Sequence, residues 1–186
     1  MKKIDARIDR SRRAIIDAAL ELLPAKPSAT LAELAGHANV ARATLYRHFK
    51  NRTELIRVTA RECAYAMNGV LGPISLQPLT GREAIEACIR AYFPIVDKYY
   101  FLKFFQFEIE EDEVVRNLIE AYYATLRGIV TRAVEEGSVR NTLQVEFITH
   151  ALDCVLYAGW EMLGKGMSVD EAADHTISVF FDGAAP

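Results

Sequence analysis

The stretch TLAELAGHANVARATLYRHFKNRTELI, residues 30–56, decides how the rest of the chain is interpreted. Apolar residues recur in it at helical spacing in two short runs, 31–37 and 42–48, separated by the turn residues 38–40. Two short helices joined so tightly must cross steeply, which is the helix-turn-helix arrangement. Asn39 suits the turn because asparagine tolerates the left-handed backbone region.

The same periodicity separates a buried face from an exposed one. We call the helix-turn-helix and the helix before it the head. Its expected core consists of the inward-facing residues Leu31, Leu34, Ala35, Val40, Leu45 and Phe49, closed by Ile15, Ala18, Ala19 and Leu22 of the preceding helix. Removing these residues leaves a polar, cationic face on the second short helix: Arg42, Ala43, Thr44, Tyr46, Arg47 and His48.

Such a face has the chemistry of a DNA reader. Arginine can donate two parallel hydrogen bonds to guanine, hydroxyl groups can bond phosphates, and a small alanine can lie against a thymine methyl. Lys50 and Arg52 lie at the start of the next helix, where the helix dipole also favours a phosphate.

Residues 30–56 resemble the DNA-binding helices of the TetR (tetracycline-repressor) family of bacterial transcription regulators. The run ATLYRHFKN, residues 43–51, matches the family's Thr-Leu-Tyr-x-His-Phe and the lysine that follows it. The resemblance is specific over roughly residues 10–56. Two residues depart from the usual pattern: Asn39 replaces a glycine, and Ala41 replaces a serine whose helix cap is worth about 1 kcal/mol.

The resemblance implies roles for individual positions. Thr44, Tyr46 and His48 match residues that usually contact phosphates or base methyls, and Arg42, Ala43 and Arg47 match positions that vary with the operator. The predicted DNA-binding set is therefore Thr30, Arg42, Ala43, Thr44, Tyr46, Arg47, His48, Lys50 and Arg52.

The charge distribution admits two interpretations. The 186 residues carry a net charge of −3, yet residues 1–61 hold 13 lysines and arginines against 6 acids, and residues 62–186 hold 9 against 19. This asymmetry is typical of a polyanion-binding head on a non-binding body. Chance clustering of solvated surface charge is the alternative. At 51% hydrophobic and 25% charged residues the composition is that of a globular protein.

The whole chain is predicted to be all-α, because strand alternation is nowhere sustained. We expect an N-terminal helix-turn-helix domain over 1–56, with a basic arm over 1–9, and a helical effector-binding and dimerisation domain over 57–186. Capping signals at Thr30, Asn51, Thr80 and Ser168 mark helix starts, and Pro94 should end or kink a helix. About nine helices follow, near 9–23, 31–37, 42–48, 52–67, 81–98, 100–110, 112–136, 143–164 and 169–182, with a Gly/Pro link at 69–79.

The basic N-terminal residues allow two interpretations. They either form an arm that touches the minor groove or the DNA backbone, as homeodomain arms do, or they only aid solubility. The cations concerned are Lys2, Lys3, Arg7, Arg10, Arg12 and Arg13.

The body contains an aromatic surplus between residues 92 and 107. An aromatic stripe at helical spacing is more often core than pocket, but later helices add hydroxyl groups and an indole that could orient a guest. The resemblance implies a small apolar or aromatic effector that releases DNA. The predicted effector-binding set is Phe101, Phe104, Phe105, Glu108, Tyr123, Tyr157 and Trp160.

The last two long helices are predicted to form a homodimer seam, with packing inside one chain as the alternative. Two heads about 34–36 Å apart, or a multiple of one DNA turn, would read a near-palindromic operator. Gly159 is expected to allow close approach at the seam. The predicted interface set is Phe147, Ala151, Val155, Ala158, Met162, Ala173, Ile177 and Phe180.

Other classes of function fit poorly. The acidic run 108–113 is expected to be a solvated helix junction, and no phosphate loop or metal-ligand spacing occurs, so we expect no enzyme activity, no metal and no cofactor. Cys63, Cys88 and Cys154 are too few and too far apart for a disulfide framework. With no signal peptide pattern and no long apolar run, the expected location is cytoplasmic. The alternatives are an effector-independent or redox-sensing regulator, and a protein-interaction module with an idle DNA-binding head.

Overall fold

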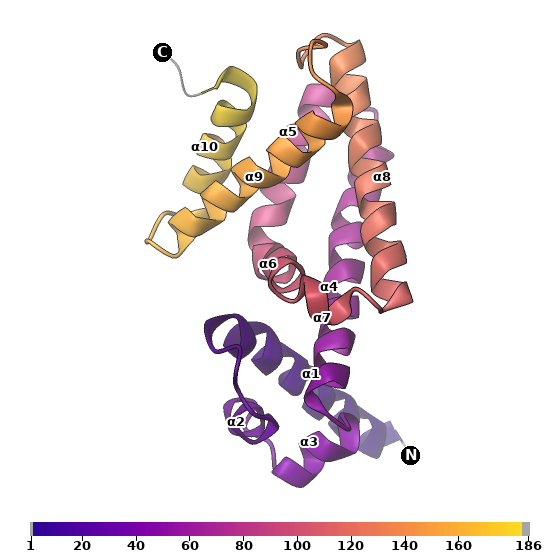
Figure 1. Cartoon of the computed structure of the whole chain (residues 1–186), viewed down its shortest axis with the longest axis vertical. Coiled ribbons are helices and arrows are strands. Elements are labelled where there is room, and N and C mark those ends of the chain that lie inside the picture. The colour runs from indigo at the N-terminus through magenta and orange to yellow at the C-terminus, as the bar shows by residue number, and fades with distance from the viewer. Residues whose placement is uncertain (1, 184–186) are drawn as a thin grey trace. The chain divides into compact units, whose positions relative to one another are not determined.

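The computed structural model describes the backbone of residues 2–183 and the side chains of residues 8–183. Over this part of the chain the protein is all-α, as the periodicity predicts, with ten α-helices and one 3₁₀ turn (Figure 1). No helix within residues 2–183 has both the length and the apolar character needed to span a membrane. The elements are α1 (Lys2–Ala25), α2 (Leu31–His37), α3 (Arg42–His48), α4 (Arg52–Ser75), α5 (Gly81–Tyr92), η1 (Phe93–Ile95), α6 (Val96–Phe104), α7 (Gln106–Ile109), α8 (Glu113–Glu135), α9 (Val145–Leu163) and α10 (Val169–Asp182).

The helices form two compact units. The N-terminal unit holds the described residues up to Tyr65 together with Asp97–Leu118, and the C-terminal unit holds the other described residues. Helices α4 and α8 contribute to both units. The assignment of DNA binding to residues 1–56, and of effector binding and dimerisation to residues 57–186, stays a prediction.

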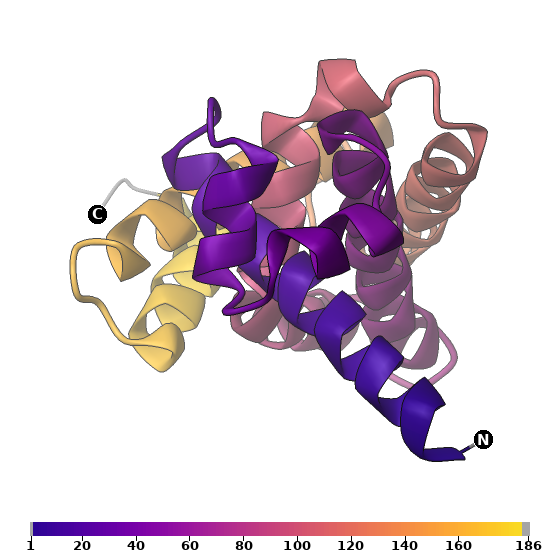
Figure 2. The ribbon, with the colours of Figure 1, turned by 90° about the horizontal axis from the view of Figure 1, so that it is seen from below.

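Helices α1, α2 and α3 pack against one another in the N-terminal unit (Figures 1 and 2). Ile15, Ala19, Leu34, Leu45 and Phe49 are almost fully buried, which confirms most of the expected core of the head. Leu22, Leu31 and Val40 are only partly buried, and Leu23 is buried beside them.

The capping signals fix several helix starts. Complete capping boxes form at Thr30, Thr80 and Ser168, where the side-chain oxygen accepts from the backbone N–H three residues later and the glutamate there reaches back. Asn51 makes half of a box: its Oδ1 accepts from the Glu54 N–H at 2.8 Å, but the Glu54 carboxylate accepts from the Lys50 N–H instead.

Three expected boundaries were wrong. Helix α1 begins at Lys2 rather than near residue 9. Helix α4 continues to Ser75 through the predicted link, because Pro73 lies in its last turn and removes only one donor, while Leu71 and Ile74 are buried and Ser75 Oγ donates to the Gly72 carbonyl. The predicted helix 100–110 is broken into α6 and α7.

Pro94 ends α5, as expected. The chain passes from α5 into the 3₁₀ turn Phe93–Ile95 and then into α6. In the C-terminal unit, α10 packs against α9, α5 and η1. Gly159 makes this packing possible, because a Cβ on Gly159 would lie 2.5 Å from Thr176 Oγ1 and 2.6 Å from Phe93 Cζ. The close approach that Gly159 allows therefore lies inside the chain, which corrects its expected place at the seam between chains.

Candidate nucleic-acid interface

The turn between α2 and α3 has the conformation that its sequence predicts. Asn39 has a φ of 51°, and it is the only described residue other than glycine with a positive φ. The Val40 N–H then bonds the Ala35 carbonyl at 2.9 Å, which closes the turn tightly. Ala41 occupies the N-cap of α3 and makes no side-chain cap bond, so the first turn of this helix keeps free N–H groups.

Helix α3 buries one residue and exposes a broad polar face. Leu45 is buried, and Phe49 directly after the helix is buried too. The side chains of Arg42, Ala43, Tyr46, Arg47 and Lys50 are exposed, with Tyr46 at 54%. An exposed tyrosine on a helix held rigidly from behind is available to a partner.

The cations of this face lack partners within the described part of the chain. No ion pair joins Arg42, Arg47 or Lys50 to a carboxylate there. Arginines elsewhere in the N-terminal unit behave differently: Arg12 and Arg13 both pair with Glu62, at 3.7 and 3.6 Å. Positive charge that no described carboxylate neutralises is thus concentrated around α3, where it can attract a polyanion.

His48 is turned toward α1. Its Nε2 lies 2.8 Å from Ser11 Oγ, and the Ser11 hydroxyl donates to the Ile8 carbonyl at 2.9 Å. Because the hydroxyl proton is used there, the His48 ring donates to Ser11. Burial lowers the pKa of His48, and the neighbouring charges of Arg47 and Arg12 lower it further. A neutral His48 therefore joins the end of α3 to α1. The sequence analysis expected a phosphate contact from His48 and did not predict this structural role.

Two other members of the predicted DNA-binding set make contacts inside the protein. Thr30 caps α2, and its hydroxyl bonds the Glu33 carboxylate. The Arg52 guanidinium donates to the Pro27 carbonyl and lies 5.8 Å from the centre of the Phe105 ring. Arg52 thus connects the start of α4 both to the loop before α2 and to the segment after α6. Phosphate contacts by Thr30 and Arg52 stay predictions.

The basic arm predicted over 1–9 is part of α1 from Lys2 onward. The side chains of Lys2, Lys3 and Arg7 lie outside the described residues. Arg10 is exposed, and Arg12 lies over the Phe49 ring at 5.9 Å as well as pairing with Glu62. A contact between this segment and DNA stays a prediction.

An ion pair joins α4 to the start of α8, and the sequence analysis missed it. Asp112 is 4% exposed, and Arg61 Nε bonds its two oxygens at 3.2 and 3.1 Å, with Nη2 at 2.9 Å from Oδ2. Asp112 Oδ1 also accepts from the Val115 N–H at 3.2 Å and so caps α8. Burial raises the pKa of Asp112, but the hydrogen bond from Arg61 and the other favourable contacts outweigh it, and the net pKa is lowered.

The acidic run 108–113 is therefore only partly a solvated junction. Glu108, Glu110, Glu111 and Glu113 are exposed as expected, whereas Asp112 is buried and paired. Its position at the start of the predicted helix 112–136 was the available signal, because aspartate is a preferred N-cap residue.

The predicted effector-binding residues fall in both units. Phe101 and Phe105 are buried in the N-terminal unit with ring centres 4.7 Å apart, whereas Phe104 and Glu108 are exposed. The break between α6 and α7 divides the predicted helix 100–110, in which these four residues lie. In the C-terminal unit, Tyr123, Tyr157 and Trp160 are at least partly exposed, and the Tyr157 and Trp160 rings lie 6.2 Å apart. Binding of an effector by this set stays a prediction.

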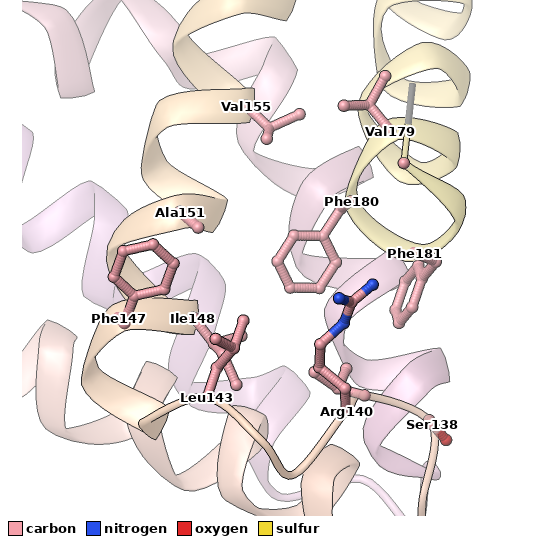
Figure 3. Close-up of a pocket in the computed structure, with 12 residues that line it drawn as sticks. Ser138, Arg140, Leu143, Phe147, Ile148, Ala151, Val155, Val179, Phe180 and Phe181 are labelled. Atoms are coloured by element: carbon pink, nitrogen blue, oxygen red, sulfur yellow. The ribbon is translucent and has the colours of Figure 1, made fainter. Parts of the chain in front are cut away.

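The predicted seam lies along a groove between α9 and α10. Figure 3 shows Phe147, Ala151 and Val155 on one side of this groove and Val179 and Phe180 on the other, in a hollow of about 250 Å³. A second apolar hollow continues it past Cys154, Ala158 and Met162. Of the predicted set, Ala173 is buried because α10 packs on α9 within the chain, and Phe147, Ala151, Val155, Ala158, Met162, Ile177 and Phe180 keep exposed surface. Their use in a dimer stays a prediction.

The three cysteines are free and differ in their surroundings. Cys63 and Cys88 are buried, and burial raises the pKa of each thiol to about 12. Cys154 is exposed. Within the described residues, no group of histidine, cysteine and acidic side chains is placed to hold a metal ion.

The N-terminal helices are similar in sequence to those of known bacterial regulators. Residues 15–59 match the model of the bacterial regulatory proteins of the tetR family. Over 53 residues, 28% of each chain, the protein is 45% identical to the HTH-type transcriptional repressor LfrR of Mycolicibacterium smegmatis. It is 23% identical to the repressor KstR2 of Rhodococcus jostii over 84% of its own length and 81% of that protein.

The fold of the whole chain is shared with solved structures. The structure of LfrR from Mycobacterium smegmatis in complex with proflavine covers 97% of this chain and 99% of its own, with a TM-score of 0.79 at 22% identity. AibR in complex with isovaleryl coenzyme A and operator DNA covers 92% of this chain and 98% of its own, with a TM-score of 0.76 at 15% identity. At such identities the likeness concerns the fold.

Proposed function

The chain belongs to the TetR family of bacterial regulatory proteins, and from this premise we propose that it is a sequence-specific DNA-binding regulator of transcription that reads the major groove with α3. The observation that carries the proposal is the exposed face of this helix. Its cations have no ion-pair partners within the described residues, while Leu45 and Phe49 hold the helix in place from behind. The protein is a regulator and not an enzyme.

The residues of α3 and of the segment directly after it divide by chemistry. Arg42 and Arg47 carry donors that can pair with guanine, so they are the candidates for reading sequence. Tyr46 and Lys50 suit phosphate oxygens, which position a reader without specifying sequence. Ala41 leaves the N–H groups at the start of α3 free, and those groups can also donate to a phosphate.

We propose that the regulator acts as a homodimer through the groove between α9 and α10. Seven of the eight predicted seam residues keep exposed surface, and the groove is lined mainly by apolar side chains. One helix-turn-helix head gives little specificity, whereas two heads related by a two-fold axis read a near-palindrome.

We further propose that a small molecule controls DNA binding and that the protein is a repressor released by this effector. The solved relatives with proflavine and with isovaleryl coenzyme A plus operator DNA support this mode of regulation. An effector shifts the equilibrium only by binding the two states differently, with a coupling of typically about 1–3 kcal/mol. Within the N-terminal unit, Arg52 and Arg61 join α4 to the segment 105–112, and so they can pass a displacement on to the head. A repressor of this kind works where the chromosome lies, which in bacteria is the cytoplasm.

The proposal is tested by selecting bound fragments from sheared DNA of the source organism and comparing variants. We expect a short near-palindrome to emerge, Tyr46→Ala to weaken binding of every sequence, and Arg42→Ala to relax preference at one position by about 1–3 kcal/mol. Arg90→Ala is the matched control, because Arg90 lies in the C-terminal unit and pairs with Asp174 at 2.7 Å. Equal binding of all fragments by all variants would contradict the proposal and leave a protein-interaction module with an idle head.

A further inference from the structure

The imidazole ring of His48 is held at one of its two nitrogens. Nε2 lies 2.8 Å from Ser11 Oγ, and the Ser11 hydroxyl donates to the Ile8 carbonyl at 2.9 Å, so the ring N–H donates to Ser11. Within the described residues the other nitrogen, Nδ1, has no hydrogen-bond partner, and His48 is only half-buried. A group from outside the chain can therefore reach this nitrogen.

The bond to Ser11 decides where the ring carries its proton. A neutral imidazole has one N–H, and Ser11 keeps that N–H at Nε2. Nδ1 then presents a lone pair, which repels the oxygens of a phosphate and cannot donate to them. A phosphate contact at Nδ1 therefore requires a second proton, because only the charged ring donates from both nitrogens.

The surroundings of the ring keep it neutral in the free protein. Burial lowers the pKa of His48 from its ordinary value of 6.5, and the charges of Arg47 on α3 and Arg12 on α1 lower it further. Glu62 of α4 pairs with Arg12 at 3.7 Å, and no carboxylate of the described residues pairs with His48. The phosphates of DNA would bring the missing negative charge, which favours the charged ring.

We propose that Ser11 is a positioning residue for DNA binding, because it leaves Nδ1 of His48 for a phosphate, and that His48 takes up a proton when the operator binds. The inference rests on the proposed function and adds a regulation by pH to the same face of the head. The DNA complex holds the proton more tightly than the free protein does. Operator affinity is therefore highest at low pH and falls as the pH rises through the pKa of the bound His48.

The test measures affinity for the selected operator by fluorescence anisotropy at pH 6 and pH 8, at one salt concentration. One proton per head changes affinity by at most tenfold per pH unit, so we expect wild-type binding to be about tenfold tighter at pH 6. His48→Gln still donates to Ser11 but takes up no proton, so its affinity should change less than about twofold. His37→Gln is the matched control and should keep the wild-type profile, because His37 already pairs with Glu21 at 2.9 Å.

Variants of Ser11 separate its positioning role from a role in folding. Ser11→Ala frees the ring to carry its single proton at Nδ1, so a neutral His48 can donate to a phosphate and the pH dependence should fall below about threefold. Ser11→Thr keeps the hydroxyl and should retain the wild-type profile. Equal weakening of Ser11→Ala at both pH values would show a purely structural role and overturn the inference. Circular dichroism establishes that each variant is folded.

Nitrogen-15 NMR of the His48 ring detects the proton directly. We expect the N–H at Nε2 and a pKa below 6.5 in the free protein, and protons on both nitrogens in the operator complex at pH 6. An N–H at Nδ1 in the free protein, or parallel pH profiles of the wild type and His48→Gln, overturns the inference while DNA binding stands. Failure to bind any fragment at either pH contradicts the proposed function itself and removes the inference with it.

Discussion

The ion pair between Arg61 and Asp112 makes the sharpest prediction about stability. Asp112→Asn keeps an oxygen that can cap α8 but removes the charge that Arg61 contacts through three N–O distances of 2.9–3.2 Å. Hydrogen bonds to charged groups contribute about 1.5–3 kcal/mol when well formed. The Arg61 side chain is 44% exposed, so water screens part of this interaction. We therefore expect the free energy of unfolding to fall by about 1–2 kcal/mol.

The assay is urea unfolding followed by circular dichroism, with Glu111→Gln as the control. Glu111 is the neighbouring residue, is 81% exposed and pairs with Arg57 at 3.3 Å, so its substitution should change stability by less than about 0.5 kcal/mol. A double-mutant cycle with Arg61→Gln should return a coupling of about 1 kcal/mol or more. If Asp112→Asn and Glu111→Gln proved equally harmless, the reasoning about burial would be refuted.

The same pair predicts a pH dependence. The pKa of Asp112 is lowered in the folded protein from its ordinary value of 3.8. A carboxyl group with a lowered folded pKa contributes stability that is present above pH 3.8 and is lost as the pH falls through the folded value. The stability difference between the wild type and Asp112→Asn should therefore be full at pH 7 and shrink below about pH 4. A difference that stayed constant down to pH 2 would contradict this origin.

Further predictions concern single sites. Gly159→Ala should destabilise by about 1–3 kcal/mol in chemical denaturation, because the new Cβ meets Thr176 Oγ1 at 2.5 Å; an unchanged midpoint would show that the α9–α10 contact is looser than described. Ala41→Ser supplies the missing cap of α3 and should stabilise by about 0.5–1 kcal/mol, and thermal unfolding should shift upward. Of the three thiols, only that of Cys154 should react with a disulfide reagent in the native protein, and the two buried ones should react after unfolding; fast reaction of all three would count against the burial.

Much of the head could be predicted from the sequence, because its signals are local. The bounds of α2 and α3 follow from the Thr30 capping box, from the turn that Asn39 tolerates and from the buried spacing that ends at Phe49. Each of these devices acts within a few residues. The exposed face of α3 consists of the residues that this buried spacing leaves over.

The features that the sequence did not reveal depend on partners distant in the chain. His48 faces Ser11, 37 residues away, and Asp112 faces Arg61, 51 residues away. Periodicity predicts which side of a helix is buried but not which buried group it meets. Gly159 was expected at a seam between chains for the same reason: a small residue indicates a close neighbour without saying whether Thr176 of the same chain or another chain supplies it.

The wrong end of α4 has another physical cause. Pro73 was expected in a link over 69–79, because a proline removes a backbone donor and crowds the preceding turn. Pro94 lies within the 3₁₀ turn that follows α5, whereas Pro73 stays in the final turn of α4, where it removes one hydrogen bond and the burial of Leu71 and Ile74 holds the turn in place.

The salt dependence of operator binding tests most directly the central claim, that α3 and the residues directly after it contact the phosphates of DNA. The slope of log K against log salt concentration should be steep for the wild type and should fall by about one for each phosphate contact removed. Lys50→Ala should therefore reduce the slope, and Arg90→Ala in the C-terminal unit should leave it unchanged. A shallow wild-type slope, or one that Lys50→Ala does not alter, would contradict the account.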